Sequence, residues 1–385
     1  MGHPEQWRVA LLLRNKKNMK TFFTLLWLVL TSHLSVVAQT VTVPFEAGRW
    51  TSENADFAFE TFMEKPSVLL KSGFIYAKDV ELQDGIIEFD INFPQQRGFP
   101  GVVFRVADPM NAENFYMRPH QSGNPDATQY TPVFNGEAGW QLYHGEGYSK
   151  AFPFKFNTWQ HVRIDVHGLQ AEIYIDDMQS PLIRVTELKQ DPRPGKIGLV
   201  SGGLPVHFAD FRYTPKTPAL FSRQPIPENG KDGLITRWQV GNGGSRKMFE
   251  KRSVIPPDME KKLKWSTQST EPSGTINLSK HMQAADSGKT IVARIVIQSA
   301  NDQLKPLSFG FSDYVTIFLN DRALFSGRDN FMSRDYRFLG TIGYFDTVFL
   351  PLKKGDNELW FVVWEDFGGC GVKAKFEDMT GITLK

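Results

Sequence analysis

The feature that most constrains this chain is a two-residue alternation of apolar and polar side chains, repeated in short runs between turn residues. Residues 86–93 (IIEFDINF) follow the turn pair Asp84-Gly85, and residues 161–166 and 171–175 flank a second turn. Because side chains on a strand point alternately to its two faces, such runs indicate antiparallel sheets with one buried face. Beyond residue 38 the chain shows no long apolar stripe of helical period, so we predict an all-β protein.

Two proline-containing stretches with little periodicity divide these runs. Residues 214–218 and 224–230 together hold four prolines, and proline fixes φ and removes a backbone donor. We therefore predict a linker at 215–232, with a first domain at 39–214 and a second at 233–385. Many short strands joined by turns favour a β-sandwich for each domain. The charged stretch 247–264 is expected to be a surface insertion.

The first 38 residues have the pattern of an export signal. A lysine-rich start precedes a mostly apolar run from Phe22 to Val37, and Ala38 precedes Gln39 as a cleavage position. The run is too short and too interrupted for a membrane span, and Met19 is a more natural start than Met1. We predict a signal peptide at 1–38 and a periplasmic or extracellular mature protein that is not bound to the membrane. An uncleaved N-terminal anchor is the alternative.

The charge and the cysteine content further limit the partners and the kind of stabilisation that this protein can have. The whole chain has 44 Lys and Arg against 42 Asp and Glu, but residues 1–38 hold five of the bases and one of the acids. The mature chain is thus slightly acidic, which argues against a nucleic-acid partner. Cys370 is the single cysteine, so no disulfide forms within the chain and stability must come from core burial.

The most unusual segment is 113–148, where amide, His, Arg, Asp and aromatic side chains gather between Pro and Gly. A sugar ring has an apolar face, which suits aromatic rings, and a rim of hydroxyls, which suits these polar groups. The alternative is an ordered loop whose amides satisfy its own backbone. A metal at His120, Asp126 and His144 fits no zinc spacing. The candidate sugar-binding residues are Arg118, Gln121, Asn124, Gln129, Tyr130, Asn135, Trp140 and Tyr143, and the acid/base candidates are His120 and Asp126.

The first domain resembles the concanavalin A-like lectin and glucanase superfamily over about residues 40–214. Residues 85–90 (GIIEFD) look like its opening strand, residues 159–176 like the hairpin of laminin-G-like domains, and residues 195–211 like the closing strands. The closing strands also resemble those of 3-keto-disaccharide hydrolases. The resemblance implies a concanavalin A-like jelly roll, and these motifs are specific to the fold rather than to a function.

Two functional features of that superfamily can be compared residue by residue. Its glucanases carry the acids E-x-D-x-x-E on one strand; Glu88 and Asp90 match the first two, but the third position is Phe93. Without that proton donor this strand is not expected to hydrolyse glycosides. The resemblance also implies a structural calcium held by a Gly carbonyl and an Asp, for which Gly85 and Asp210 are the candidates. No other cofactor is predicted.

The second domain resembles galactose-binding-like jelly rolls over about residues 290–365. Residues 314–327 look like their hairpin, with Asn320-Asp321 as its turn, and residues 350–359 look like a later turn and strand. In such modules the domain often only packs against a partner domain.

We therefore expect two β-sandwich domains, a concanavalin A-like jelly roll followed by a galactose-binding-like one. The predicted function is that of an exported carbohydrate-binding protein or accessory module acting on glycans, with its site in 113–148. A glycoside or modified-sugar hydrolase that uses the same cleft is one alternative. A structural or protein-binding exported module is another. The sequence leaves open which of these holds, and it leaves the oligomeric state open.

Overall fold

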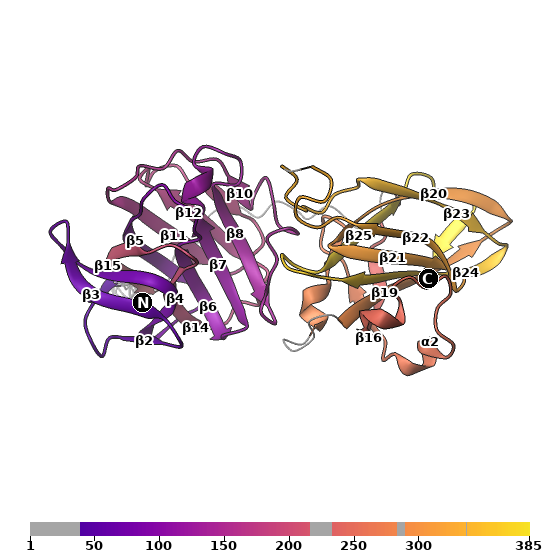
Figure 1. The fold of residues 1–385 in the computed structure, drawn as a ribbon, viewed down its shortest axis with the longest axis horizontal. Helices are drawn as coiled ribbons and strands as arrows, with labels where there is room; N and C mark the ends of the chain where they lie inside the picture. Colours follow the sequence, from indigo (N-terminus) through magenta and orange to yellow (C-terminus); the bar gives the residue numbers. More distant parts are fainter. Residues whose placement is uncertain (1–38, 216–232, 283–288, 336) are drawn as a thin grey trace, which may run out of the picture. The chain divides into compact units, whose positions relative to one another are not determined.

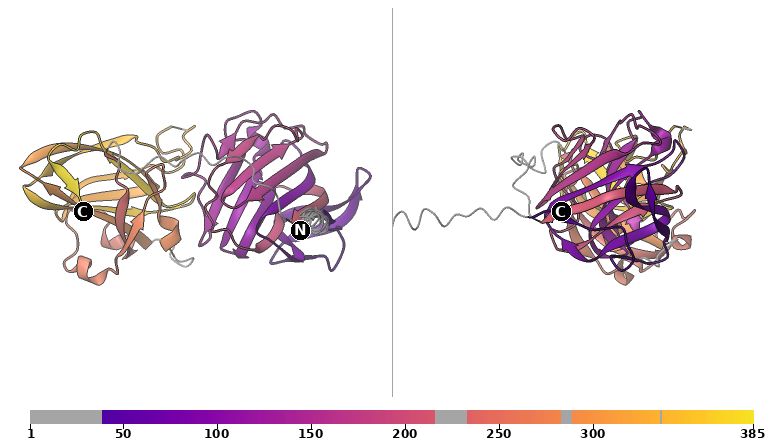
Figure 2. Two further views of the ribbon diagram at one scale, coloured as in Figure 1. Left: turned by 180° about the vertical axis from the view of Figure 1, so that it is seen from behind. Right: turned by 90° about the vertical axis from the view of Figure 1, so that its left-hand side faces the viewer.

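A computed structural model describes residues 39–215, 233–282, 289–335 and 337–385. The predicted signal peptide lies outside these ranges, as does all of the predicted linker except Pro215, the last residue of strand β15. Nearly all regular structure in the described ranges is β-strand (Figures 1 and 2). None of the helices in these ranges is long and apolar enough to cross a membrane.

The strands that precede residue 216 form a first sandwich. They are β1 (Val41–Thr42), β2 (Trp50–Ser52), β3 (Asp56–Phe62), β4 (Lys65–Leu82), β5 (Gly85–Asn92), β6 (Gly101–Asp108), β7 (Asn111–Met117), β8 (Thr128–Phe134), β9 (Glu137–Ala138), β10 (Ser149–Lys150), β11 (Gln160–His167), β12 (Gln170–Ile175), β13 (Ile183–Val185), β14 (Gly195–Ser201) and β15 (Val206–Pro215). A short 3-10 helix, η1 (Pro119–Gln121), follows β7.

The long strand β4 takes part in both layers of this sandwich. Its first half pairs with β15, and the order continues through β5, β11 and β12 to β13; we call this layer A. Its second half pairs with β14, and the order continues through β6, β7 and β8 to β10; we call this layer B. All of these pairings are antiparallel, so one curled sheet supplies both layers.

The alternation in β5 defines the inside of the sandwich. Ile87, Phe89 and Ile91 are fully buried in the core, while Glu88 points to the outer face of layer A. The predicted hairpin of β11 and β12 is confirmed, since His167 pairs with Gln170 at its turn. Period-two patterning thus predicted correctly which side chains fill this core.

The remaining strands form a second sandwich with its own core. They are β16 (Arg237–Ser245), β17 (Ser266–Ser269), β18 (Thr275–Asn277), β19 (Lys289–Ser299), β20 (Gln303–Ser312), β21 (Tyr314–Leu319), β22 (Arg322–Arg328), β23 (Asp346–Leu352), β24 (Gly355–Trp364), β25 (Gly371–Phe376) and β26 (Ile382–Leu384). One layer has the order β17-β16-β19-β24-β21-β22, with β26 paired to β19; the other has the order β18-β25-β20-β23. The predicted all-β fold with two β-sandwiches is confirmed.

Two segments of the second sandwich test the sequence interpretation. The predicted turn between β21 and β22 is confirmed: Asn320 and Asp321 both have positive φ, as a tight hairpin turn requires. Residues 247–264 were expected to be a surface insertion. This is only partly correct, because their apolar side chains cover the outer face of the larger layer. Phe249 and Met259 pack there against Trp360 and are buried. Short helices accompany this sandwich: η3 (Arg246–Met248), α2 (Met259–Lys262) and η4 (Leu278–His281).

Candidate functional site

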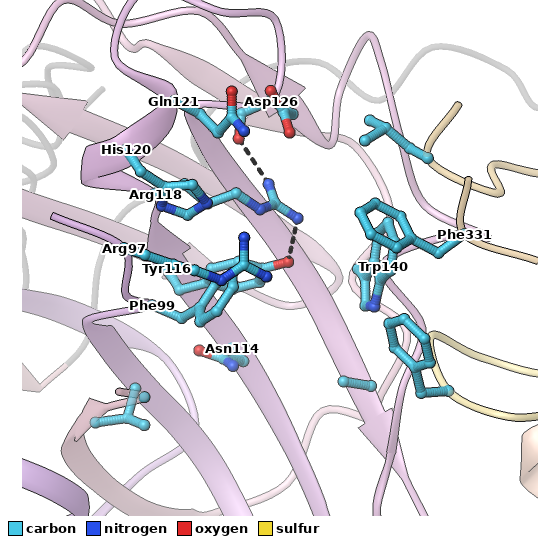
Figure 3. A pocket seen from close by; sticks show the side chains of 15 residues that line it. Arg97, Phe99, Asn114, Tyr116, Arg118, His120, Gln121, Asp126, Trp140 and Phe331 are labelled. Atoms are coloured by element: carbon cyan, nitrogen blue, oxygen red, sulfur yellow. Dashed lines mark hydrogen bonds between the residues drawn. The ribbon is translucent and has the colours of Figure 1, made fainter. Parts of the chain in front are cut away.

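A cavity of about 460 Å³ lies against the outer face of layer B. Figure 3 shows a polar and aromatic wall that faces Trp140 and Phe331 across the cavity. Its lining residues are Arg97, Phe99, Asn114, Tyr116, Arg118, His120, Gln121, Asp126, Ala138, Trp140, Val200, Gly202, Phe331, Leu339 and Phe367.

Strand β7 presents one wall of this cavity because its side chains alternate. Phe115 and Met117 are fully buried in the core, so Asn114 and Tyr116 point outward from layer B and reach the cavity. The chain leaves the strand at Arg118 and enters helix η1, which begins with a proline. This change of direction brings the residues that follow β7 to the rim of the same cavity.

Arg118 is the central polar group of the wall and is 6% exposed. Its guanidinium donates to the backbone carbonyl of Asp126, the hydroxyl of Tyr116 and Oε1 of Gln129, each at 2.6 Å. It also lies over the ring of Trp140, 5.8 Å from the ring centre. Neutral acceptors and aromatic faces therefore hold this cation in a fixed orientation.

The two acid/base candidates, His120 and Asp126, both line the cavity. Burial, assisted by the positive charges of Arg97 and Arg118, lowers the pKa of His120 below its usual 6.5. The ring packs edge-on against Phe99, with ring centres 5.6 Å apart. A neutral imidazole can accept a proton near neutral pH, so a general base is chemically available here.

Five of the ten candidate residues come together in the cavity, and five lie elsewhere. Those in the cavity are Arg118, His120, Gln121, Asp126 and Trp140. Those outside it are Asn124, Gln129, Tyr130, Asn135 and Tyr143. The segment 113–148 is also not one loop, since β7 and β8 run through it.

The residues outside the cavity have structural partners of their own. Gln129 is fully buried behind the wall, where it accepts from Arg118 and donates to the carbonyl of Trp140. Tyr130 is a core residue whose hydroxyl donates to the buried carboxyl of Glu113. Its ring cannot reach a ligand.

The last three candidates are Asn124, Asn135 and Tyr143. Each forms a hydrogen bond either with a residue close in the sequence or with a residue of the second sandwich. Asn124 donates to the side chain of Gln121. Asn135 donates to the backbone of Ser279, and Tyr143 donates to Glu271, so both join the first sandwich to the second. These residues were selected for residue type, and their polar groups are used within the fold.

Several cavity residues were not predicted. Arg97 and Phe99 lie between β5 and β6. The neighbouring Gly98 and Pro100 indicate a turn there, which was the available local signal in the sequence. Phe331, Leu339 and Phe367 come from the second sandwich. No local pattern could place these three beside Trp140, because the sequence separation is about 200 residues and only tertiary packing brings them together.

Glu88 and Asp90 lie on the outer face of layer A, away from the cavity. The His161 ring bridges them, at 2.6 Å from Asp90 and 3.3 Å from Glu88. Arg212 also pairs with Glu88 at 2.8 Å, and Lys65 pairs with Asp90. The hydrogen bond from His161 is the largest cause that lowers the pKa of Glu88 to about 2. The pair therefore belongs to an ion network on the outer face of this layer.

The predicted calcium ligands do not meet. In the pairing of β5 with β15, Gly85 lies opposite Pro215 and Asp90 lies opposite Ala209, the neighbour of Asp210. Gly85 and Asp210 are therefore about five strand residues apart, or roughly 16 Å. Calcium holds its ligands at about 2.4 Å, so these two residues cannot ligate one ion.

His144 is not among the residues that line the cavity with His120 and Asp126. It lines a second cavity, of about 710 Å³, together with residues such as Pro125 and Arg184. Among the described residues there is no group of three or more His, Cys, Asp or Glu side chains placed to hold a metal ion. The geometry of the described chain therefore gives no support to a metal at these histidines.

The single curled antiparallel sheet that supplies both layers has the form of a concanavalin A-like jelly-roll sandwich. More particularly, residues 47–214 match the model of the family of 3-keto-alpha-glucoside-1,2-lyase-like domains. The predicted resemblance to 3-keto-disaccharide hydrolase-like domains is thereby confirmed for this part of the chain. No curated protein matches the chain.

Solved structures similar to this chain include a carbohydrate binding module, CBM66, from Bacillus subtilis. It shares 20% identity, with 43% of this chain and 96% of that chain covered and a TM-score of 0.34. A β-glucanase of Bacillus licheniformis shares 12% identity over 46% of this chain and 98% of its own, with a TM-score of 0.34. A Bacillus subtilis protein with a galectin-like fold shares 9% identity over 46% and 96%, with a TM-score of 0.35.

Proposed function

We propose that this chain is an exported carbohydrate-binding protein, or an accessory module acting on glycans, and that the cavity on layer B is its sugar site. The observation that carries the proposal is the convergence of Trp140 with Arg118, His120 and Asp126 in one cavity. The match of residues 47–214 to a family of sugar-directed domains supports the same class of ligand.

The chemistry of the two walls suits a pyranose. Trp140, Phe331 and Phe99 supply flat apolar surface for the C–H face of a sugar ring. The side chains of Asn114 and Gln121 offer donors and acceptors to its hydroxyls. A volume of about 460 Å³ lies within the range of pockets for small molecules, so we expect one or two sugar units to be enclosed.

Titration calorimetry against a panel of soluble oligosaccharides tests this proposal. Replacement Trp140→Ala should weaken binding about tenfold, because one aromatic contact contributes roughly 1–2 kcal/mol. Phe349→Ala is the matched control, since this aromatic side chain is 59% exposed on the second sandwich and does not line the cavity. A panel without any binding sugar would favour a structural or protein-binding role instead.

A hydrolase acting on a glycoside or modified sugar is the second candidate function. The presence of His120 and Asp126 in the same cavity favours it, since both side chains are of the types that transfer protons in general acid–base catalysis. The double replacement His120→Ala with Asp126→Ala should then abolish turnover while part of the sugar affinity remains. Turnover that survives this replacement would exclude both residues as the acid and base.

A further inference from the structure

Two guanidinium groups line the cavity, and neither has a carboxylate partner. Within the described ranges, no carboxylate oxygen lies within 4.0 Å of the side-chain nitrogens of Arg97 or Arg118. Two other arginines of the same sandwich are paired with carboxylates: Arg212 contacts Glu88 at 2.8 Å, and Arg105 contacts Asp84 at 3.0 Å. The cavity therefore holds two positive charges that no carboxylate of the described chain pairs.

The remaining charges of the cavity do not cancel this excess. Asp126 is its single acidic lining residue, against two arginines. His120 adds no negative charge. Burial is the largest cause that lowers its pKa, and the positive charges of Arg97 and Arg118 lower it further. A buried or half-buried cation without a counter-ion is costly, so a negatively charged ligand would be stabilised here.

The two arginines, Arg118 and Arg97, differ in exposure and in their hydrogen-bond partners. Three neutral acceptors already engage Arg118, so it is held in place and contributes mainly its charge. Arg97 is exposed, and its guanidinium lies 5.6 Å from the ring centre of Phe99. In Figure 3 it extends toward the cavity beside Tyr116. Its planar group is free to form two parallel hydrogen bonds with an oxyanion.

We propose that the sugar bound in this cavity carries an anionic group, a uronate carboxylate or a sulfate ester, which Arg97 binds directly in the positive field of Arg118. This inference rests on the proposed sugar-binding function and specifies its ligand. The aromatic wall would contact the apolar face of the ring, while the anionic substituent would point toward the arginines. Neutral sugars would lack the contact with Arg97 and would bind more weakly.

Paired ligands that differ only in charge provide the test. The full mature protein is titrated with oligogalacturonides and with their carboxyl-reduced, neutral forms, and with sulfated galactan oligosaccharides and their desulfated forms. We expect one anionic series to bind at least about tenfold more tightly than its neutral partner, as charge-assisted hydrogen bonds predict. The series that shows the preference identifies the anionic group. The preference should shrink as salt is raised.

Two variants assign the effect to the cavity. Arg97→Gln should weaken binding of the anionic sugar several-fold more than binding of its neutral partner, because only the charge of Arg118 then remains in the cavity. Arg237→Gln is the matched control, because Arg237 is exposed on the second sandwich and does not line the cavity. Thermal unfolding should give the same midpoint for both variants and the parent protein.

The outcomes separate this inference from the function on which it rests. Equal binding of anionic and neutral partners, or a preference that is undiminished in Arg97→Gln, overturns the inference and leaves sugar binding standing. Binding of neither series, together with no binding across the oligosaccharide panel, overturns both. A preference that Arg97→Gln diminishes and Arg237→Gln retains supports both.

Discussion

The ion network on the outer face of layer A makes a contribution to stability that depends on pH. Hydrogen bonds to Asp90 and Glu88 raise the pKa of His161 from 6.5 to about 9. A change of this size corresponds to about 3 kcal/mol at a fully shielded site. The His161 side chain is 26% exposed, and solvent screens such pairs, so we expect about half of that, roughly 1.5 kcal/mol.

The direction of the pH dependence follows from the protonation state of the His161 ring that the folded protein favours. Charged His161 stabilises the folded state, so the contribution is complete below pH 6.5 and is lost as the pH rises through about 9. Replacement His161→Gln should therefore lower the free energy of unfolding by about 1–2 kcal/mol at about pH 6, and by much less at about pH 10. Urea unfolding followed by tryptophan fluorescence measures both values.

A second histidine provides the control for this experiment. Burial lowers the pKa of His144 below 6.5, so its neutral ring is the favoured form in the fold. The loss of unfolding free energy caused by His144→Gln should not decrease between about pH 6 and pH 10. If His161→Gln lowers the unfolding free energy by the same amount at both pH values, the charged His161 ring does not stabilise the fold through this network.

Three further predictions concern stability. Gly101→Ala should cost about 2 kcal/mol or more, because its new Cβ would lie 2.0 Å from the carbonyl oxygen of Phe115; urea unfolding measures the loss. Tyr143→Phe removes the hydrogen bond to Glu271 and should lower the unfolding free energy by about 1 kcal/mol in the same assay. Burial raises the pKa of Glu113 to about 7, so the parent protein should lose stability as pH rises from 4.5 to about 7, and Glu113→Gln should not show that loss in a pH series of unfolding curves.

The sequence predicted the fold well where one strand face is buried and the other is solvated. The run at Ile87, Phe89 and Ile91 shows this, since all three are fully buried. It failed in β7 and β8, which were included in a loop segment. Their outward side chains are polar but buried: Gln129 and Thr131 are fully covered, so polarity there does not indicate solvent exposure. Alternation cannot be recognised in such strands.

The site was predicted where a single segment supplies its residues. Trp140 and Arg118 belong to one unusual stretch, and residue chemistry was sufficient to select them. Residue type alone could not separate Arg118 from Tyr130, because the face on which each side chain lies is set by the strand register. Arg97 and Phe331 come from elements distant in the sequence, and only the packed structure brings them to the same cavity.

The position of a bound sugar tests the central claim most directly. A crystal structure of the protein with the tightest-binding oligosaccharide of the panel would locate it. We predict a sugar ring against Trp140, with its polar substituents directed toward Arg118 and Arg97. A sugar bound on the outer face of layer A, near His161 and Glu88, or on the second sandwich with the cavity empty, would contradict the assignment of the site.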